Sequence, residues 1–268
     1  MDNTLKNQSR KLSASQRKKI SKRFFLFTLI SFLVNYTNCI MAADYSKVMT
    51  VSLGPAWGYD NNNNQTFYLA PDIEKTYAAK NPTNAMVDLG IFLGLQKTFP
   101  SPWVQVQSIT GQLGLALVFA GNAKLSGDIW DDANEEFNNY NYNYKLNHTH
   151  VALEGKVLID KGYWLTPWVS ASIGVGFNRA YAFNNSPTIF EAVQNSNFSS
   201  YTQTALTYTI SAGLQKSFDK NWQAGVGYEF ADWGKSKLGR ASGQTMNDGL
   251  TLNHYYVNSI LFNLSYIT

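Results

Sequence analysis

The sequence predicts an all-β fold, an eight-stranded antiparallel up-and-down transmembrane β-barrel preceded by a signal peptide. Three observations support this prediction. Eight segments alternate apolar and polar residues with a period of two, their connections alternate between short and long, and aromatic residues bracket the short connections. A strand with two different faces separates two different solvents, which in a membrane barrel are lipid and a polar lumen.

The composition of the 268 residues fits a membrane barrel. Aromatic residues make up 15% of the chain and charged residues another 15%, whereas about a quarter of the residues in typical soluble domains are charged. The mean hydropathy of -0.25 alone would indicate a soluble protein. A membrane barrel, however, distributes its apolar residues in alternation and needs no long apolar run.

Residues 1–43 are predicted to be a secretory signal peptide, and residues 44–268 the barrel. A basic stretch at 17–23 precedes the apolar run Phe24–Val34, and the small residues Ala42 and Ala43 suggest cleavage before Asp44. The alternative is an N-terminal membrane anchor, but the run is shorter than the roughly 20 residues that a spanning helix needs.

Removal of this segment changes the charge of the chain. Eight of the 22 Lys and Arg and one of the 18 Asp and Glu leave with it, so 14 positive and 17 negative residues remain, a net charge of -3. No basic footprint for nucleic acid survives. The lone Cys39 leaves as well, so the mature chain has no disulfide and no thiolate metal site.

The first four predicted strands each carry apolar side chains on one face. Residues 49–57 place Val51 and Leu53 opposite Thr50 and Ser52, and residues 87–96 and 108–119 repeat the pattern. The fourth segment, 150–159, is the most polar. Each is near the 9 to 11 residues that a tilted strand needs to cross the hydrocarbon.

The last four predicted strands have glycine, serine and threonine on their inner faces. They cover residues 165–177, 206–215, 222–230 and 259–266, and the closing strand sets Phe262 and Leu264 against Asn263 and Ser265. An even number of strands places both termini of the barrel on one side of the membrane, as in bacterial single-chain barrels.

The connections indicate the orientation of the barrel. Three are short and contain turn residues, Pro100–Pro102, Asp160–Gly162 and Asp219–Asn221. The other four, roughly 60–84, 120–140, 181–202 and 234–250, are predicted to be long polar loops. Short turns face the periplasm and long loops face outward in barrels of this kind.

Aromatic residues near the strand ends are predicted to form two girdles at the membrane interfaces. The inner girdle consists of Phe99, Trp103, Tyr163, Trp164, Phe218, Trp222 and Tyr266. The outer girdle consists of Trp57, Tyr59, Phe119, Phe177, Phe230 and Trp233.

Four charged residues point inward and are predicted to form a lumen charge network: Asp88, Glu154, Lys156 and Glu229. Side chains fill the interior of an eight-stranded barrel, so we expect a hydrogen-bonded, charge-paired plug. The alternative is a narrow path for ions past the same charges.

Further candidate sites lie near the predicted outer end. Arg179, Lys235, Lys237 and Arg240 are candidate contacts for lipopolysaccharide phosphates, with ordinary solvated loop charge as the alternative. The acidic stretch at 128–136 is expected to be solvated because it lacks the spacing of a calcium loop. His148 and His150 share a face with no evident third ligand, so neither a metal nor another cofactor is expected.

No spacing of Asp, His and Ser singles out a nucleophile with its base, so the sequence predicts that the chain is not an enzyme.

The chain from Val48 onward resembles the small outer-membrane barrels of the group that includes the OmpA transmembrane domain, OmpX and OmpW. The strand rhythm, the girdles and the closing strand carry this resemblance. The segments Gly121–Asp128 and Gly225–Gly234 also resemble an uncharacterised gammaproteobacterial outer-membrane β-barrel family. Most members end on an aromatic residue that the barrel-insertion machinery recognises, whereas this chain ends Tyr266, Ile267, Thr268.

The resemblance implies a protein of the bacterial outer membrane. Because the chain stops with the predicted last strand, we expect no periplasmic peptidoglycan-binding domain after it. The expected partners are outer-membrane lipid and lipopolysaccharide, the barrel-insertion machinery, and a host or surface ligand at the long loops. We therefore expect a structural or adhesin-like surface-interaction protein with a plugged lumen. The alternatives are a narrow channel for ions or small apolar solutes and a soluble lipocalin-like barrel.

Overall fold

The computed structural model describes residues 45–60, 64–80 and 84–268. The predicted signal peptide, its cleavage site and Cys39 lie outside these residues. Within the described chain, no helix has the length and the apolarity to cross a membrane.

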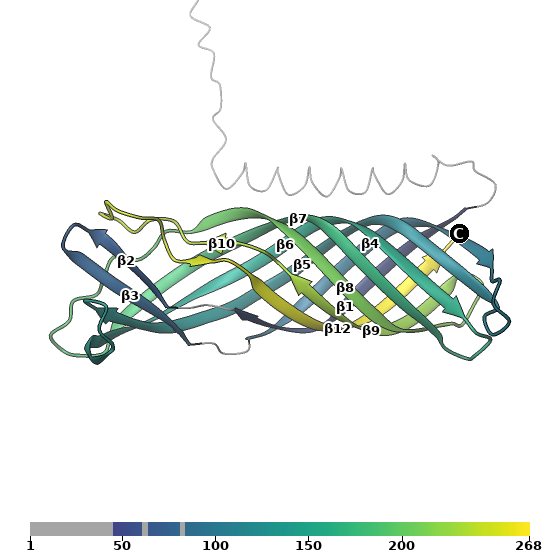
Figure 1. The fold of residues 1–268 in the computed structure, drawn as a ribbon, viewed down its shortest axis with the longest axis horizontal. Helices are drawn as coiled ribbons and strands as arrows, with labels where there is room; N and C mark the ends of the chain where they lie inside the picture. Colours follow the sequence, from purple (N-terminus) through teal and green to yellow (C-terminus); the bar gives the residue numbers. More distant parts are fainter. Residues whose placement is uncertain (1–44, 61–63, 81–83) are drawn as a thin grey trace, which may run out of the picture. The chain divides into compact units, whose positions relative to one another are not determined.

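Eight of the described strands form a closed antiparallel barrel (Figure 1), as the sequence predicts. Each of them pairs with its neighbours in barrel order, and β1 closes the ring against β12, with Leu53 opposite Phe262. The strands are β1 (Ser46–Asp60), β4 (Asn84–Pro100), β5 (Ser108–Asp131), β6 (Asn138–Asp160), β7 (Thr166–Pro187), β8 (Tyr201–Ser217), β9 (Trp222–Asp232) and β12 (Tyr255–Ile267).

The predicted faces of all eight segments are confirmed. Large apolar side chains such as Leu53, Leu115, Ile173 and Phe262 are more than half exposed on the outside of the barrel. The inner positions are small or polar, which leaves room for a few large side chains. A Cβ on Gly227, for example, would clash with the ring of Trp168 inside the barrel.

Aromatic residues form a girdle at each end of the apolar belt. Trp103, Tyr163, Trp164 and Phe218 are exposed beside the short turns, and Tyr59, Phe119 and Phe177 are exposed on the outer face at the opposite end. The prediction for Trp233 was wrong. Its side chain is 1% exposed and lies inside the barrel, because the chain turns inward after Asp232.

The short connections have the predicted chemistry, although the first is longer than expected. It covers residues 101–107. In the second, Gly162 has a φ of 76° and donates its N–H to the Asp160 carboxylate. In the third, the Asn221 amide donates to the carbonyl of Ile267 on the closing strand.

The four connections predicted to be long polar loops consist of strands for much of their length. Strands β5, β6 and β7 continue well beyond the girdle, and residues 60–84 contain the hairpin of β2 (Gln65–Ala70) and β3 (Ile73–Lys80). Strand β3 pairs with the upper part of β5, from Ser126 to Asp131. The short pair β10 (Ser236–Lys237) and β11 (Thr251–Leu252) lies in the last long connection. We call the part of the molecule beyond the outer girdle the extension.

The extension has its own hydrophobic core because the apolar face of the strands changes sides. In β6, Tyr140, Tyr142, Tyr144 and Leu146 point inward and are buried, whereas Val151 and Leu153 point outward to lipid. The described members of this core are mostly aromatic and aliphatic residues from every part of the extension: Tyr77, Leu125, Ile129, Tyr140, Tyr142, Tyr144, Leu146, Phe183, Phe198, Trp233, Leu238, Leu250, Leu252 and Tyr255.

Candidate functional site

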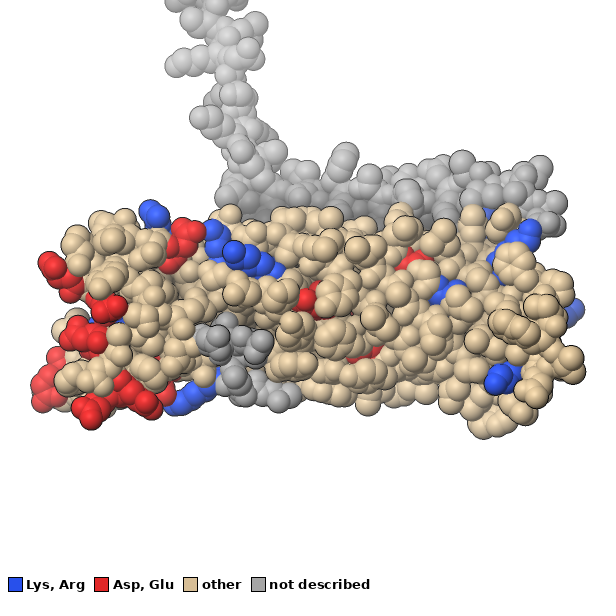
Figure 2. All heavy atoms as spheres, in the orientation of Figure 1, with Lys and Arg blue, Asp and Glu red and all other residues tan. Residues whose placement is uncertain are grey.

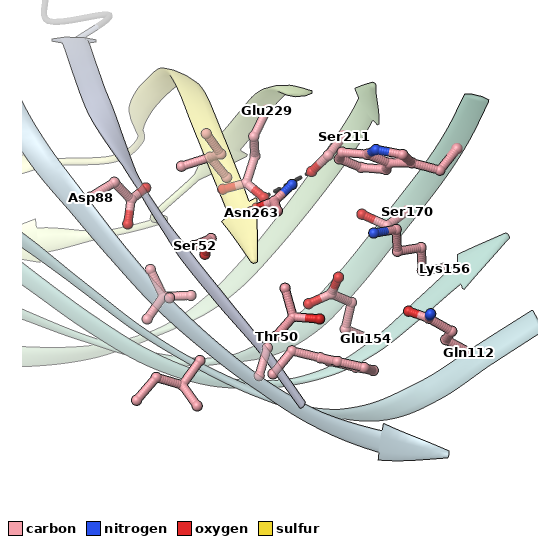
Figure 3. Close-up of a pocket in the computed structure, with 17 residues that line it drawn as sticks. Thr50, Ser52, Asp88, Gln112, Glu154, Lys156, Ser170, Ser211, Glu229 and Asn263 are labelled. Atoms are coloured by element: carbon pink, nitrogen blue, oxygen red, sulfur yellow. Dashed lines mark hydrogen bonds between the residues drawn. The ribbon is translucent and has the colours of Figure 1, made fainter. Parts of the chain in front are cut away.

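The four predicted lumen charges line one cavity in the membrane-spanning half of the barrel (Figure 3). Its volume of about 60 Å³ corresponds to roughly four or five water-sized spheres. Asp88 comes from β4, Glu154 and Lys156 from β6, and Glu229 from β9. The close-up places Asp88 and Lys156 on opposite sides of this space.

Hydroxyl and amide groups contact these charges directly. Ser211 donates to the Glu229 carboxylate at 2.8 Å and Ser259 to the Asp88 carboxylate at 3.3 Å. Lys156 donates to the Gln215 side-chain oxygen at 2.9 Å and lies 4.3 Å from the centre of the Trp168 ring. Among the ion pairs of the described residues, none joins Lys156 to a carboxylate.

The cavity is polar and incompletely satisfied by protein groups. Asp88 Oδ1, Gln112 Oε1 and Trp168 Nε1 are buried without a protein hydrogen-bond partner, and all three residues line the space. Water in the cavity would satisfy such groups. No group of three or more His, Cys, Asp or Glu in the described chain is arranged to hold a metal ion.

Above the cavity, His148 and His150 belong to a buried hydrogen-bonded cluster with Asn178. The Asn178 amide nitrogen donates to the carbonyls of Trp233 and Lys235, so its oxygen must accept from Nδ1 of His148, at 2.6 Å. The Nε2 of His148 then accepts from Nδ1 of His150, at 2.8 Å. Because both nitrogens of His148 are occupied, this arrangement accounts for the paired histidines without a metal.

The Trp233 ring stacks on His148, with centroids 4.4 Å apart, and begins the aromatic core that fills the extension. Tyr77, Tyr142, Phe183 and Phe198 continue this core with centroid separations between 4.9 and 6.5 Å. Burial and the nearby Asp131 carboxylate raise the pKa of Tyr77, which keeps its hydroxyl neutral. Large rings therefore occupy the space through which a solute would enter the lumen from outside.

The four cations predicted to contact lipopolysaccharide lie on the outer surface of the extension, but their surroundings differ. Lys237 and Arg240 both approach Asp248, at 2.9 and 3.6 Å. These two cations raise the local positive potential and hold the pKa of Asp248 below its ordinary value, with the Lys237 hydrogen bond as the largest cause. Arg179 lies 5.2 Å from the centre of the Tyr181 ring, and Lys235 is exposed.

Two further cations were missed in the sequence. Lys124 and Lys145 are exposed and directly opposite each other on β5 and β6. Asn147, next on the same face of β6, is opposite Arg179 on β7. On β6 the outward alternation of Val151 continues back to Lys145 and could have indicated that residue. On β5 a bulge between Ala120 and Ala123 reverses the faces of the strand, so local alternation could not place Lys124 outside. Figure 2 shows Lys and Arg atoms next to the acidic end of the molecule.

A histidine–carboxylate pair on the outer surface was also missed. The buried Asp232 carboxylate contacts Nδ1 of His254 at 2.8 Å and accepts the backbone N–H of Gly234 at 2.7 Å. The His254 side chain is 54% exposed. Such a pair orients an imidazole, but in the described chain no hydroxyl is hydrogen-bonded to the other ring nitrogen.

A closed barrel with an apolar outer belt and two aromatic girdles defines an integral β-barrel protein of the bacterial outer membrane. The surroundings of the belt are therefore membrane lipid.

Comparison with known proteins gives similar solved structures but no family and no curated sequence. No family model matches the chain, and no curated protein matches its sequence. Among solved structures, Neisserial surface protein A is 8% identical with a TM-score of 0.43, and the alignment covers 82% of this chain and 96% of that one. OprG from Pseudomonas aeruginosa is 12% identical with a TM-score of 0.40, covering 84% and 97%.

The prediction that the chain is not an enzyme needs correction. The outer membrane protease OmpT from Escherichia coli is also among the similar structures, at 10% identity and a TM-score of 0.44, covering 87% of this chain and all of that one. The similar structures therefore include an enzyme, and the lack of a sequence motif does not exclude catalysis. Enzymatic activity is established neither way.

Proposed function

We propose that this barrel acts as a surface-interaction protein, with its lumen closed and its extension presented to the exterior. The observation that supports the proposal most directly is the aromatic core, which occupies the interior of the extension above the lumen cavity. Much of the chain outside the membrane belongs to strands, which form a rigid scaffold. Exposed segments on a rigid scaffold commonly contain the residues that bind a partner.

Two measurements test this function together. Purified, refolded protein in planar bilayers should give no reproducible conductance steps. Cells that display the protein should be retained on protein-coated surfaces more strongly than cells displaying a form in which a two-residue turn replaces residues 124–145. Conducting protein without any gain in retention would contradict the proposal.

The second candidate function is a narrow ion path. The polar cavity favours it, because three carboxylates and one lysine face a space that protein groups do not fully satisfy. Regular conductance steps that change when Glu229 is replaced by glutamine would support this alternative.

We also propose that lipopolysaccharide phosphates bind the cations on the outer face of the extension. Lys124, Lys145 and Arg179 form the centre of this cationic patch, and Lys235 adds a further positive charge. Asp248 partly neutralises Lys237 and Arg240. Lys and Arg suit phosphate recognition, and the patch lies just beyond Phe119 and Phe177 of the outer girdle.

Thermal stability with and without added lipopolysaccharide tests this binding. The K124Q/K145Q/R179Q variant should lose most of the increase in melting temperature, whereas the K161Q/K220Q control, altered in the periplasmic turns, should keep it. An equal increase in both variants would contradict the assignment.

A further inference from the structure

The far end of the extension combines exposed apolar side chains with unpaired acidic ones. We call it the tip and define it as residues 72–75, 131–139 and 187–193. Hydrogen bonds connect these segments, because Thr188 binds the backbone of Asn138 and Asn139, and the Asp132 N–H donates to the Glu74 carbonyl. The tip is therefore one continuous surface.

The apolar residues of the tip are unusually exposed. Phe190 is 100% exposed and Val193 is 81% exposed, and Ile73, Phe137 and Ile189 are each between 44% and 49% exposed. These residues lie far beyond the outer girdle, so lipid does not cover them. Clustered exposed apolar side chains beyond the membrane are typical of a binding surface.

Acidic side chains surround these apolar residues. Six of them, Asp72, Glu74, Asp132, Glu135, Glu136 and Glu191, take part in no ion pair of the described chain. The lysine of the tip, Lys75, is buried and already paired with Asp131. Figure 2 shows Asp and Glu atoms concentrated at one end of the molecule, the end where β2 and β3 lie in Figure 1.

The negative charge of the tip restricts which partners can bind this surface. Six unpaired carboxylates repel lipopolysaccharide, nucleic acid, acidic polysaccharides and the tip of a second copy. They attract a surface with the opposite charge, and Phe190 provides a protruding aromatic side chain of the kind that anchors many interfaces in an apolar pocket.

We propose that the tip binds a cationic, amphipathic protein segment, in which lysine or arginine side chains flank apolar ones. Phe190 and Val193 supply the apolar contact, and Glu135, Glu136 and Glu191 supply the charge that attracts the partner. This inference rests on the proposed surface-interaction function and names the class of its partner.

Binding of a defined peptide tests the inference. The full chain is refolded into phosphatidylcholine nanodiscs, and fluorescence anisotropy compares an amphipathic lysine, leucine and phenylalanine peptide with a matched peptide that has glutamate for each lysine. Empty nanodiscs provide the blank. The lysine peptide should bind above the blank and the glutamate peptide should not, and the affinity should fall as salt is raised.

Variants separate the two contributions. The F190S/V193S variant should weaken binding of the lysine peptide by about tenfold, as expected for the loss of an interface anchor. The E135Q/E136Q/E191Q variant should weaken it by roughly fivefold and reduce its salt dependence. The matched controls V104S and D219N change an exposed valine and an exposed aspartate at the periplasmic end and should bind as the wild type does.

Equal binding of the two peptides, no binding above the blank, or unchanged affinity in F190S/V193S would each overturn the inference. Heat-modifiable gel migration shows that every variant is folded. If the peptide-binding results contradict the inference while displayed cells are still retained on protein-coated surfaces, only the proposed partner class is wrong. Loss of cell retention together with channel conductance would instead overturn the proposed function itself.

Discussion

Single residues decide where the lumen ends. Asn178 is fully buried and binds the backbone on both sides of Gly234, so it fixes the turn that directs Trp233 inward onto His148. In the sequence, Trp233 looks like an interface aromatic because it follows the outward-facing Phe230. Strict alternation nevertheless places Trp233 on the inner face, because it lies three residues after Phe230. Its hydrogen-bonded surroundings come from β7, a strand more than fifty residues earlier, and the local sequence does not reveal them.

We predict that Trp233→Ala destabilises the protein. Removal of this buried ring should lower the free energy of unfolding by about 3–5 kcal/mol, because it leaves a cavity beside His148 and Tyr255. Urea unfolding in lipid vesicles measures the change. Trp103→Ala, which alters a largely exposed girdle residue, serves as the control, and equal losses in both variants would contradict the buried role.

We also predict that Asp248 titrates below the ordinary range of an aspartate. Its folded pKa is lowered by Lys237, so the ion pair is fully present above the unfolded pKa, near 3.9, and is lost as the pH falls through the lower folded value. Carbon NMR of the Asp248 carboxyl in detergent micelles measures the midpoint. In Lys237→Met the midpoint should rise, and identical midpoints would show that the pair does not form.

Strand β6 carries the same alternation through two environments. Inside the membrane, the outer face of β6 is apolar because lipid surrounds it. Beyond the membrane, water surrounds it, and the asparagines of 138–143 face outward while the tyrosines between them face the core. The reversal between Leu146 and Val151 is present in the sequence, and it marks the membrane boundary on this strand.

We predict that the upper part of the β5–β6 hairpin seals the lumen. Replacement of residues 124–145 by Asn-Gly, a favoured two-residue hairpin turn, should leave a barrel that still shows heat-modifiable migration but conducts in planar bilayers. The control replaces only residues 132–136, which leaves the aromatic core intact and should keep the barrel closed. If neither form conducts, residues outside the 124–145 hairpin must close the lumen.

For the whole molecule, the sequence alone predicted the membrane half well and the outer half poorly. The eight strands, their faces and the short turns could be predicted because each strand contacts lipid on one face and the lumen on the other. This contrast appears in the local alternation of every strand. The pairing of β3 with β5 and the closure of the extension by the last long connection join segments distant in sequence. The cavity likewise combines Asp88, Glu154 and Glu229 from three strands, whose inward direction could be predicted but whose partners could not.

We predict that protease cleavage follows the orientation of the barrel. On intact cells, trypsin should cut first near Lys235 and Arg240, which are exposed outside the long strands. Lys161 and Lys220, in the short turns, should be cut only after the outer membrane is permeabilised. Mass spectrometry of the released peptides identifies the sites, and the reverse order would mean that the barrel is inserted the other way.

The continuation of β5 past the girdle sets how far the tip stands from the membrane. From Phe119 to Asp131, at about 3.3 Å per residue and a tilt of about 40°, the strand rises roughly 30 Å. The Debye length at physiological salt is about 8 Å. The membrane phosphates are thus screened from the tip, so a cationic partner can respond to the acidic end without being drawn down to the lipid.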